Sequence, residues 1–128
     1  MRILVIDDDE QMRILLRQVM EWAGYEVTEA GDGREGMHKQ RRQPANLVIT
    51  DLIMPEQEGL ETITSLKKEF PEVKIIAISG GGRIGPEAYL PAAQELGADR
   101  VFSKPFEVRE LVDAVKERLP VWKLQRFT

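Results

Sequence analysis

The sequence contains no cysteine and no long uninterrupted apolar stretch. Without cysteine the chain can form no disulfide, thiolate zinc site or thiol nucleophile. None of its apolar runs approaches the roughly 18 residues that a membrane-spanning helix requires. The first run, Ile3 to Ile6, is ended by acidic residues and lacks the features of a secretory signal. These absences predict a cytoplasmic protein with no membrane partner.

Histidine is scarce, and basic residues are outnumbered. The 18 lysines and arginines face 22 acidic residues, which gives a net charge of −4. This balance disfavours a broad nucleic-acid-binding surface, so we expect no direct contact with nucleic acid. The single histidine, His38, lies in a polar stretch, and we interpret it as solvated surface rather than as a ligand.

The length of 128 residues, 42% of them hydrophobic, fits one domain around a single core. We expect residues 1–119 to form this domain and residues 120–128 to be a C-terminal tail, a linker stub or a cloning remnant. Along the domain, short continuous apolar runs alternate with stretches in which apolar residues recur every three or four positions, as a stripe on one face of a helix. The runs predict strands at 2–6, 25–30, 46–50, 73–79 and 100–103. The stripes predict helices at 12–23, 33–42, 60–70, 92–96 and 108–119.

This fivefold alternation predicts an α/β fold, in which a doubly wound parallel sheet carries helices on both faces. Ligands of such sheets bind at the carboxyl ends of the strands. Four predicted strands end in polar side chains: Asp7 and Asp8, Asp51, Ser79 and Lys104. Each alone fits an ordinary role as a helix cap, turn residue, loop hydroxyl or solvated charge. Their convergence at one edge favours a site.

Three carboxylates at one edge raise one another's pKa unless a cation lies among them. Carboxylate oxygens without histidine or cysteine suit Mg²⁺. A lysine adds a second positive charge, so the group could bind a phosphoryl anion while a hydroxyl donates a hydrogen bond to it. A carboxylate in such a place can act as a nucleophile and form an acyl phosphate.

Four motifs occur in an order that resembles the receiver domain of two-component response regulators. They are "VIDDD", "VITDLIMPEQEGLE", "IIAISG" and "GADRVFSKPF", and the resemblance covers residues 2–119. It implies a flavodoxin-like, CheY-like fold with strand order 2-1-3-4-5. It also implies a phosphorylation-activated switch that is not an ordinary enzyme. Its partner would be a sensor histidine kinase or a phosphotransfer protein, and we expect a monomer or a weak dimer.

The resemblance assigns the acceptor and metal residues. Asp51 would accept the phosphoryl group from a phosphohistidine. Asp8, Asp51 and the main-chain carbonyl of Ile53 would ligate Mg²⁺, and Asp7 would hold a metal-bound water.

The remaining motif residues receive supporting roles. By resemblance, Lys104 would contact the phosphoryl oxygens, Ser79 would move toward them, and the bond before Pro105 would be cis. Pro55 would set a turn after the acceptor strand. We expect Gly59 to provide a positive φ before the next helix.

Three features depart from the family pattern. Val101 occupies the position of the usual aromatic residue, and Phe102 cannot replace it because neighbouring strand residues face opposite sides. The glycine-rich segment 80–92 is longer than usual, so we expect signalling to reorganise this segment. Ile53 and Gly81 cannot orient a hydrolytic water, which predicts slow self-dephosphorylation; a phosphoryl half-life of seconds would contradict this.

Two alternatives stay open. The chain could act free-standing, which we favour, or be the N-terminal receiver of a longer regulator such as a transcription factor. Less favoured is a Mg²⁺-dependent phosphohydrolase with an aspartyl nucleophile on the first strand and a second Asp two residues later. The acidic run mimics that spacing, but the following residues "EQMR" lack the expected threonine.

Overall fold

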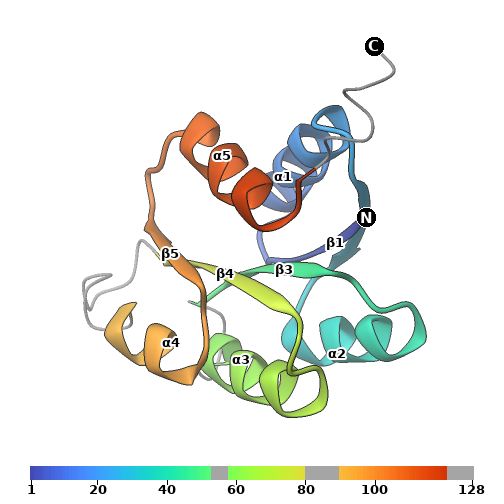
Figure 1. Cartoon of the computed structure of the whole chain (residues 1–128), viewed down its shortest axis with the longest axis vertical. Helices are drawn as coiled ribbons and strands as arrows, with labels where there is room; N and C mark the ends of the chain where they lie inside the picture. Colours follow the sequence, from blue (N-terminus) through green and yellow to red (C-terminus); the bar gives the residue numbers. More distant parts are fainter. Residues whose placement is uncertain (53–57, 80–89, 121–128) are drawn as a thin grey trace.

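The computed structural model is a single parallel sheet with helices on both faces (Figure 1). It describes residues 1–52, 58–79 and 90–120. In sequence order the strands are β1 (Arg2–Ile6), β2 (Glu26–Ala30), β3 (Leu47–Asp51), β4 (Lys74–Ser79) and β5 (Arg100–Ser103). Their spatial order is β2-β1-β3-β4-β5, so the predicted topology is confirmed.

The helices lie in two layers. They are α1 (Glu10–Trp22), α2 (Gly33–Arg42), α3 (Glu58–Glu69), α4 (Leu90–Leu96) and α5 (Val108–Arg118). Figure 1 shows α1 and α5 over one face of the sheet and α2, α3 and α4 over the other. Both faces of the central strands are therefore covered, which explains why those strands are continuously apolar rather than alternating.

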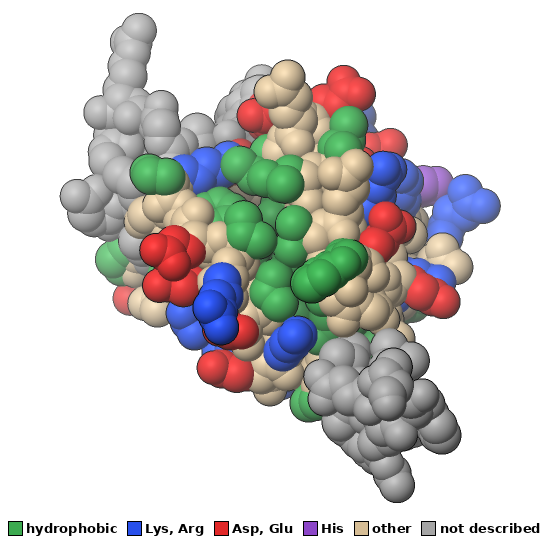
Figure 2. Space-filling view, turned by 90° about the horizontal axis from the view of Figure 1, so that it is seen from above, with side chains coloured by type: hydrophobic (Ala, Val, Ile, Leu, Met, Phe, Trp, Pro, Cys, Tyr) green, Lys and Arg blue, Asp and Glu red, His purple; other side chains and the backbone are tan. Residues whose placement is uncertain are grey.

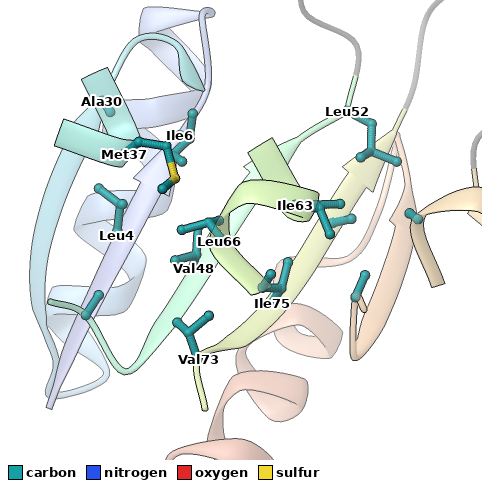
Figure 3. Packing of buried hydrophobic residues seen from close by; sticks show 14 residues of the cluster. Leu4, Ile6, Ala30, Met37, Val48, Leu52, Ile63, Leu66, Val73 and Ile75 are labelled. Atoms are coloured by element: carbon teal, nitrogen blue, oxygen red, sulfur yellow. The ribbon is translucent and has the colours of Figure 1, made fainter. Parts of the chain in front are cut away.

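Two apolar clusters form the core, one on each side of the sheet. Alternate residues of β1 separate them, since Leu4 and Ile6 belong to the cluster under α2 and α3, whereas Ile3 and Val5 belong to the cluster under α1 and α5. Figure 3 shows the first cluster, which includes Leu4, Ile6, Ala30, Met37, Val48, Leu52, Ile63, Leu66, Val73 and Ile75. This packing fixes the register of β1, and with it the point at which the acidic run leaves the sheet.

Capping residues set the ends of the helices next to that point. The Asp9 side chain accepts hydrogen bonds from the main-chain N–H of Gln11 at 3.0 Å and of Met12 at 3.4 Å, which makes it the N-cap of α1. Gly24 follows α1 with a φ of 106°, a conformation that favours glycine. Asp9 therefore begins α1, and its carboxylate serves the helix rather than the group formed by Asp7 and Asp8.

An apolar groove runs between α1 and α5 on the outer surface. Its volume is about 630 Å³, and its apolar lining comes from Leu15, Val19, Trp22, Val108 and Val112. Figure 2 shows hydrophobic side chains gathered on this face between charged ones. The Trp22 side chain is 91% exposed. Exposed apolar surface of this kind is typical of protein contact sites.

Among the helices in the described ranges, none combines the length and the apolar character that crossing a membrane would need.

Candidate functional site

Three carboxylates meet at the carboxyl edge of the sheet. Asp7 and Asp8 follow β1, and Asp51 ends the neighbouring strand β3, where Ile6 lies in register with Thr50. One oxygen from each of the three carboxylates lies within 4.8 Å of the others. Asp7 and Asp51 are buried, whereas Asp8 is exposed. The structure thus brings together the carboxylates that the sequence predicted to converge.

The donor set fits Mg²⁺. All three groups offer hard carboxylate oxygens, which this ion prefers. One oxygen of each carboxylate lies within 4.8 Å of the others, so the three groups are close enough to act together on one cation.

Asp7 is held through both its side chain and its main chain. Its Oδ1 accepts a hydrogen bond of 2.8 Å from the main-chain N–H of Asp9, and its own N–H donates to the Ala30 carbonyl. The pKa of Asp7 is raised to about 6, chiefly by burial and to a smaller extent by the charges of Asp51 and Asp8, while the Asp9 N–H and the Lys104 charge lower it. Negative charge at this position is therefore costly without a cation.

Lys104 supplies positive charge at the same edge. Its Nζ lies 3.4 Å from Asp51 Oδ2 and 3.8 Å from Asp7 Oδ2. The residue follows β5, and its main-chain N–H donates to the Ser79 carbonyl at 2.7 Å. The bond between Lys104 and Pro105 is cis, as predicted. One ammonium group offsets only one of the three carboxylate charges, so the remaining negative charge favours the binding of a further cation.

The Ser79 hydroxyl is buried beside this group. Ser79 ends β4, one residue beyond Ile78, which lies in register with Asp51. The residue is 0% exposed, and its Oγ finds no hydrogen-bond partner in the part of the chain that the structure describes. A buried polar group without a partner costs about 1–3 kcal/mol. A bound anion at Asp51 would give this hydroxyl an acceptor.

The expected role of Gly59 was wrong. Gly59 lies inside α3 and does not have a positive φ. Its need for glycine comes from close approach instead, because a Cβ there would lie 2.5 Å from Leu52 Cα and 2.6 Å from the Asp51 carbonyl oxygen. The start of α3 therefore packs directly against the main chain at the end of β3.

We expect Gly59→Ala to destabilise the protein by about 1–3 kcal/mol, because backbone rather than a flexible side chain must move to admit the methyl group. Gly31→Ala is the matched control, since its Cβ would meet the nearest atoms at 3.7 Å, an ordinary contact distance. Urea unfolding measures both free energies. Equal stability of the two variants would contradict the close-approach explanation.

Val101 and Phe102 face opposite sides of the sheet, as predicted. Val101 packs against the same apolar cluster as Leu4 and Ile6, under α2 and α3, and Phe102 belongs to the cluster under α1 and α5. The Phe102 ring lies 6.2 Å from that of Phe106 and under the Arg100 guanidinium. Phe102 therefore cannot take the place of an aromatic residue at 101.

Some predicted residues lie outside the described ranges. They are Ile53, Pro55, Gly81 and most of the segment 80–92, so the metal role of the Ile53 carbonyl, the reorganisation of the segment 80–92 on signalling and slow dephosphorylation stay predictions. Sequence reasoning missed Arg13, whose guanidinium contacts the Asp7 carbonyl.

Comparison with known proteins gives consistent matches over nearly the whole chain. The family model described as response regulator receiver domain matches residues 3–116. The response regulator receiver protein CpdR of Brucella abortus is 34% identical, over 92% of this chain and 96% of that protein. The chemotaxis protein CheY of Thermotoga maritima is 35% identical, over 91% and 95%. A crystal structure of a CheY-like receiver domain protein from Methanospirillum hungatei is 31% identical, covers 97% of each chain and has a TM-score of 0.84.

Proposed function

Because the chain belongs to the response regulator receiver domain family, we propose that Asp51 is the residue on which it accepts a phosphoryl group. The chain is a phosphorylation-activated switch of a two-component system. One observation carries the assignment of Asp51. An oxygen of this carboxylate lies within 4.8 Å of oxygens from two others, and Asp51 Oδ2 lies 3.4 Å from the Lys104 ammonium group. A cation held by the carboxylates and the lysine charge would together neutralise the oxygens of a phosphoryl group on Asp51.

Receiver domains generally bind Mg²⁺ at an acidic pocket. We propose that Asp8 and Asp51 hold the ion here and that Asp7 holds one of its waters. The bound ion would neutralise phosphoryl oxygens and draw the three carboxylates together. The closeness of the three carboxylates, which offer only hard oxygen ligands, supports this assignment.

The transfer step uses the side chains of this chain directly. An Asp51 carboxylate oxygen attacks the phosphorus of a phosphohistidine, so an oxygen–phosphorus bond forms while the nitrogen–phosphorus bond breaks. The electron pair of the broken bond stays on the imidazole nitrogen of the donor. Lys104, already 3.4 Å from Asp51 Oδ2, stabilises the charge on the transferring oxygens.

Ser79 would link phosphorylation to a change of shape. Its buried hydroxyl lacks a partner in the described part of the chain and would gain one from a phosphoryl oxygen on Asp51. Movement of the hydroxyl would pull on the end of β4 and on the segment that follows it. Val101 is smaller than the usual aromatic residue, so we propose that the output relies on this segment rather than on rotation of an aromatic ring.

We expect Ser79→Ala to stabilise the unmodified protein by up to about 1–3 kcal/mol, because it removes a buried hydroxyl that lacks a partner in the described part of the chain. The same variant should lose part of the stabilisation that beryllofluoride, a phosphoryl mimic, gives with Mg²⁺. Thermal unfolding with and without the mimic measures both effects. Ser103→Ala, at an exposed position that ends β5, is the control. An unchanged response of Ser79→Ala to the mimic would contradict the proposed contact.

The phosphoryl donor we propose is a protein, either a sensor histidine kinase or a phosphotransfer protein. The apolar groove between α1 and α5 supports a protein donor, because it exposes apolar side chains on helices that begin beside the site.

For the domain boundary we propose residue 119. Leu119 is buried, and its carbonyl accepts a hydrogen bond from the Tyr25 hydroxyl.

The phosphohydrolase alternative is disfavoured by the role of Asp9. That mechanism needs the second Asp after the first strand as an acid or base, whereas the Asp9 side chain caps α1 with two hydrogen bonds. The experiment that separates the two functions offers a phosphate ester and acetyl phosphate to the protein with Mg²⁺. Stoichiometric labelling by acetyl phosphate, without turnover of the ester, is the result we expect.

A further inference from the structure

Arg13 lies in the first turn of α1, next to the site. It connects the acidic segment Asp7–Asp9, which follows β1, to strand β2. Its Nη1 donates a hydrogen bond of 2.8 Å to the main-chain carbonyl of Asp7. Its Nε donates to Glu29 Oε1 at 3.1 Å. The side chains of Arg13 and Glu29 are only 20% and 22% exposed, so both are largely withdrawn from water. A hydrogen bond to a charged donor in such a place is stronger than an ordinary surface contact.

The bond to the Asp7 carbonyl fixes the peptide unit that carries Asp8. On its other side, the Asp7 N–H donates to the Ala30 carbonyl at 3.1 Å. Both peptide groups that flank Asp7 are therefore held. Asp8 is exposed, so the direction of its carboxylate depends on the main chain that Arg13 holds.

Arg17 provides a natural comparison one helical turn later. Its Nη1 donates to Glu29 Oε2 at 2.6 Å, and its Nε lies 3.7 Å from Glu21. The two arginines thus share the carboxylate of Glu29. Among the described residues, Arg13 has the hydrogen bond to Asp7 and Arg17 has none.

Arg13 could influence a cation in two opposite ways. Its positive charge would repel Mg²⁺ and weaken binding, whereas its hydrogen bond would hold Asp7 and Asp8 in the binding geometry and strengthen it. Glu29 pairs with the guanidinium and offsets its charge, which reduces the repulsion. The positioning effect should therefore be the larger one.

We propose that Arg13 is a positioning residue for the metal site, which holds the main chain of Asp7 and Asp8 ready for Mg²⁺ through its bond to the Asp7 carbonyl. This inference rests on the proposed Mg²⁺ role of Asp7, Asp8 and Asp51. It assigns Arg13 a contact with the loop and none with the phosphoryl group.

The test compares Arg13→Met with Arg17→Met in the full chain. Each variant removes one bond to Glu29, but Arg13→Met alone also removes the bond to Asp7. Titration calorimetry with MgCl₂ alone gives the dissociation constant for Mg²⁺. We expect it to rise about tenfold or more in Arg13→Met and less than about twofold in Arg17→Met.

A second measurement needs no metal. The Asp9 main-chain N–H bonds to Asp7 Oδ1, so its hydrogen exchange in metal-free protein reports the order of the loop. We expect exchange several-fold faster in Arg13→Met and unchanged in Arg17→Met. Arg13→Lys, which keeps the charge but lacks the two separate donor nitrogens that Arg13 uses, should fall between wild type and Arg13→Met in both measurements.

The outcomes separate this inference from the proposed function. If the wild type binds no Mg²⁺, the proposed metal site is wrong, and the exchange rates still test the loop contact. If the wild type binds Mg²⁺ and Arg13→Met binds it equally or more tightly, charge repulsion outweighs positioning and the inference is overturned. Equal losses of affinity in both arginine variants would overturn it too, because Glu29 rather than Asp7 would then be the relevant contact.

Discussion

Asp7→Asn should make the metal-free protein more stable at neutral pH, by up to about 3 kcal/mol. The pKa of Asp7 rises from 3.8 in an ordinary environment to about 6 in the folded protein, chiefly through burial, and each unit of pKa corresponds to about 1.4 kcal/mol. Ionising this side chain at pH 7 therefore costs more in the folded than in the unfolded state. Asparagine removes the charge and keeps an oxygen that can accept from the Asp9 N–H.

The sign of the pH dependence follows from the raised pKa of Asp7. The folded state holds the proton more tightly, so the favourable contribution of the neutral group is complete below pH 3.8 and is lost as the pH rises through about 6. The difference between Asp7→Asn and wild type should accordingly be large at pH 7.5 and shrink as the pH falls below 5. Urea unfolding with a chelator present measures it at both pH values.

Two controls sharpen this prediction. Asp9→Asn changes a neighbouring acid that caps α1, and asparagine caps helices about as well as aspartate, so its stability should stay near wild type. Saturating Mg²⁺ should stabilise wild type by mass action and reduce or reverse the advantage of Asp7→Asn. An Asp7→Asn protein that is less stable than wild type at pH 7.5 without metal would contradict the account.

Lys104→Met should slow phosphorylation of Asp51 by roughly a hundredfold or more, because one preorganised charge on a transferring group is worth about that factor. The same substitution should tighten Mg²⁺ binding. The Lys104 ammonium group lies 3.4 Å from Asp51 and 3.8 Å from Asp7, where it competes with the ion for the same carboxylates. Opposite effects on binding and on rate are the signature of this arrangement.

Labelling by acetyl phosphate at saturating Mg²⁺ measures the rate, and calorimetry measures the affinity for Mg²⁺. Lys74→Met is the matched control. Lys74 is exposed at the start of β4, at the opposite edge of the sheet, so neither quantity should change. If Lys104→Met weakened Mg²⁺ binding, Lys104 would be organising the carboxylates rather than competing for them, and the charge argument would be wrong.

The arrangement of strand ends could be predicted from the sequence because it depends on local patterns. Alternating apolar runs and stripes determine a parallel sheet, and parallel strands bring Asp7, Asp8, Asp51, Ser79 and Lys104 to one edge. The role of Asp9 as a helix cap is also local. Each of these inferences needs only spacing along the chain.

The parts that sequence reasoning missed depend on packing between distant segments. Arg13 reaches Glu29, sixteen residues away, and that pairing has no local pattern. The predicted reason for a glycine at position 59, a positive φ, was wrong. The actual reason is the close approach of α3 to the acceptor strand, which depends on how the helix packs. The missing partner of the Ser79 hydroxyl likewise depends on the atoms that surround it in the folded chain.

The central claim is that Asp51 accepts a phosphoryl group with the help of Mg²⁺. Intact mass spectrometry after incubation with acetyl phosphate and MgCl₂ tests it most directly, with Asp51→Asn and chelator-treated wild type alongside. We predict a mass gain of one phosphoryl group in wild type with Mg²⁺ and none in the other two samples. No gain in wild type, or an equal gain in Asp51→Asn, would contradict the account.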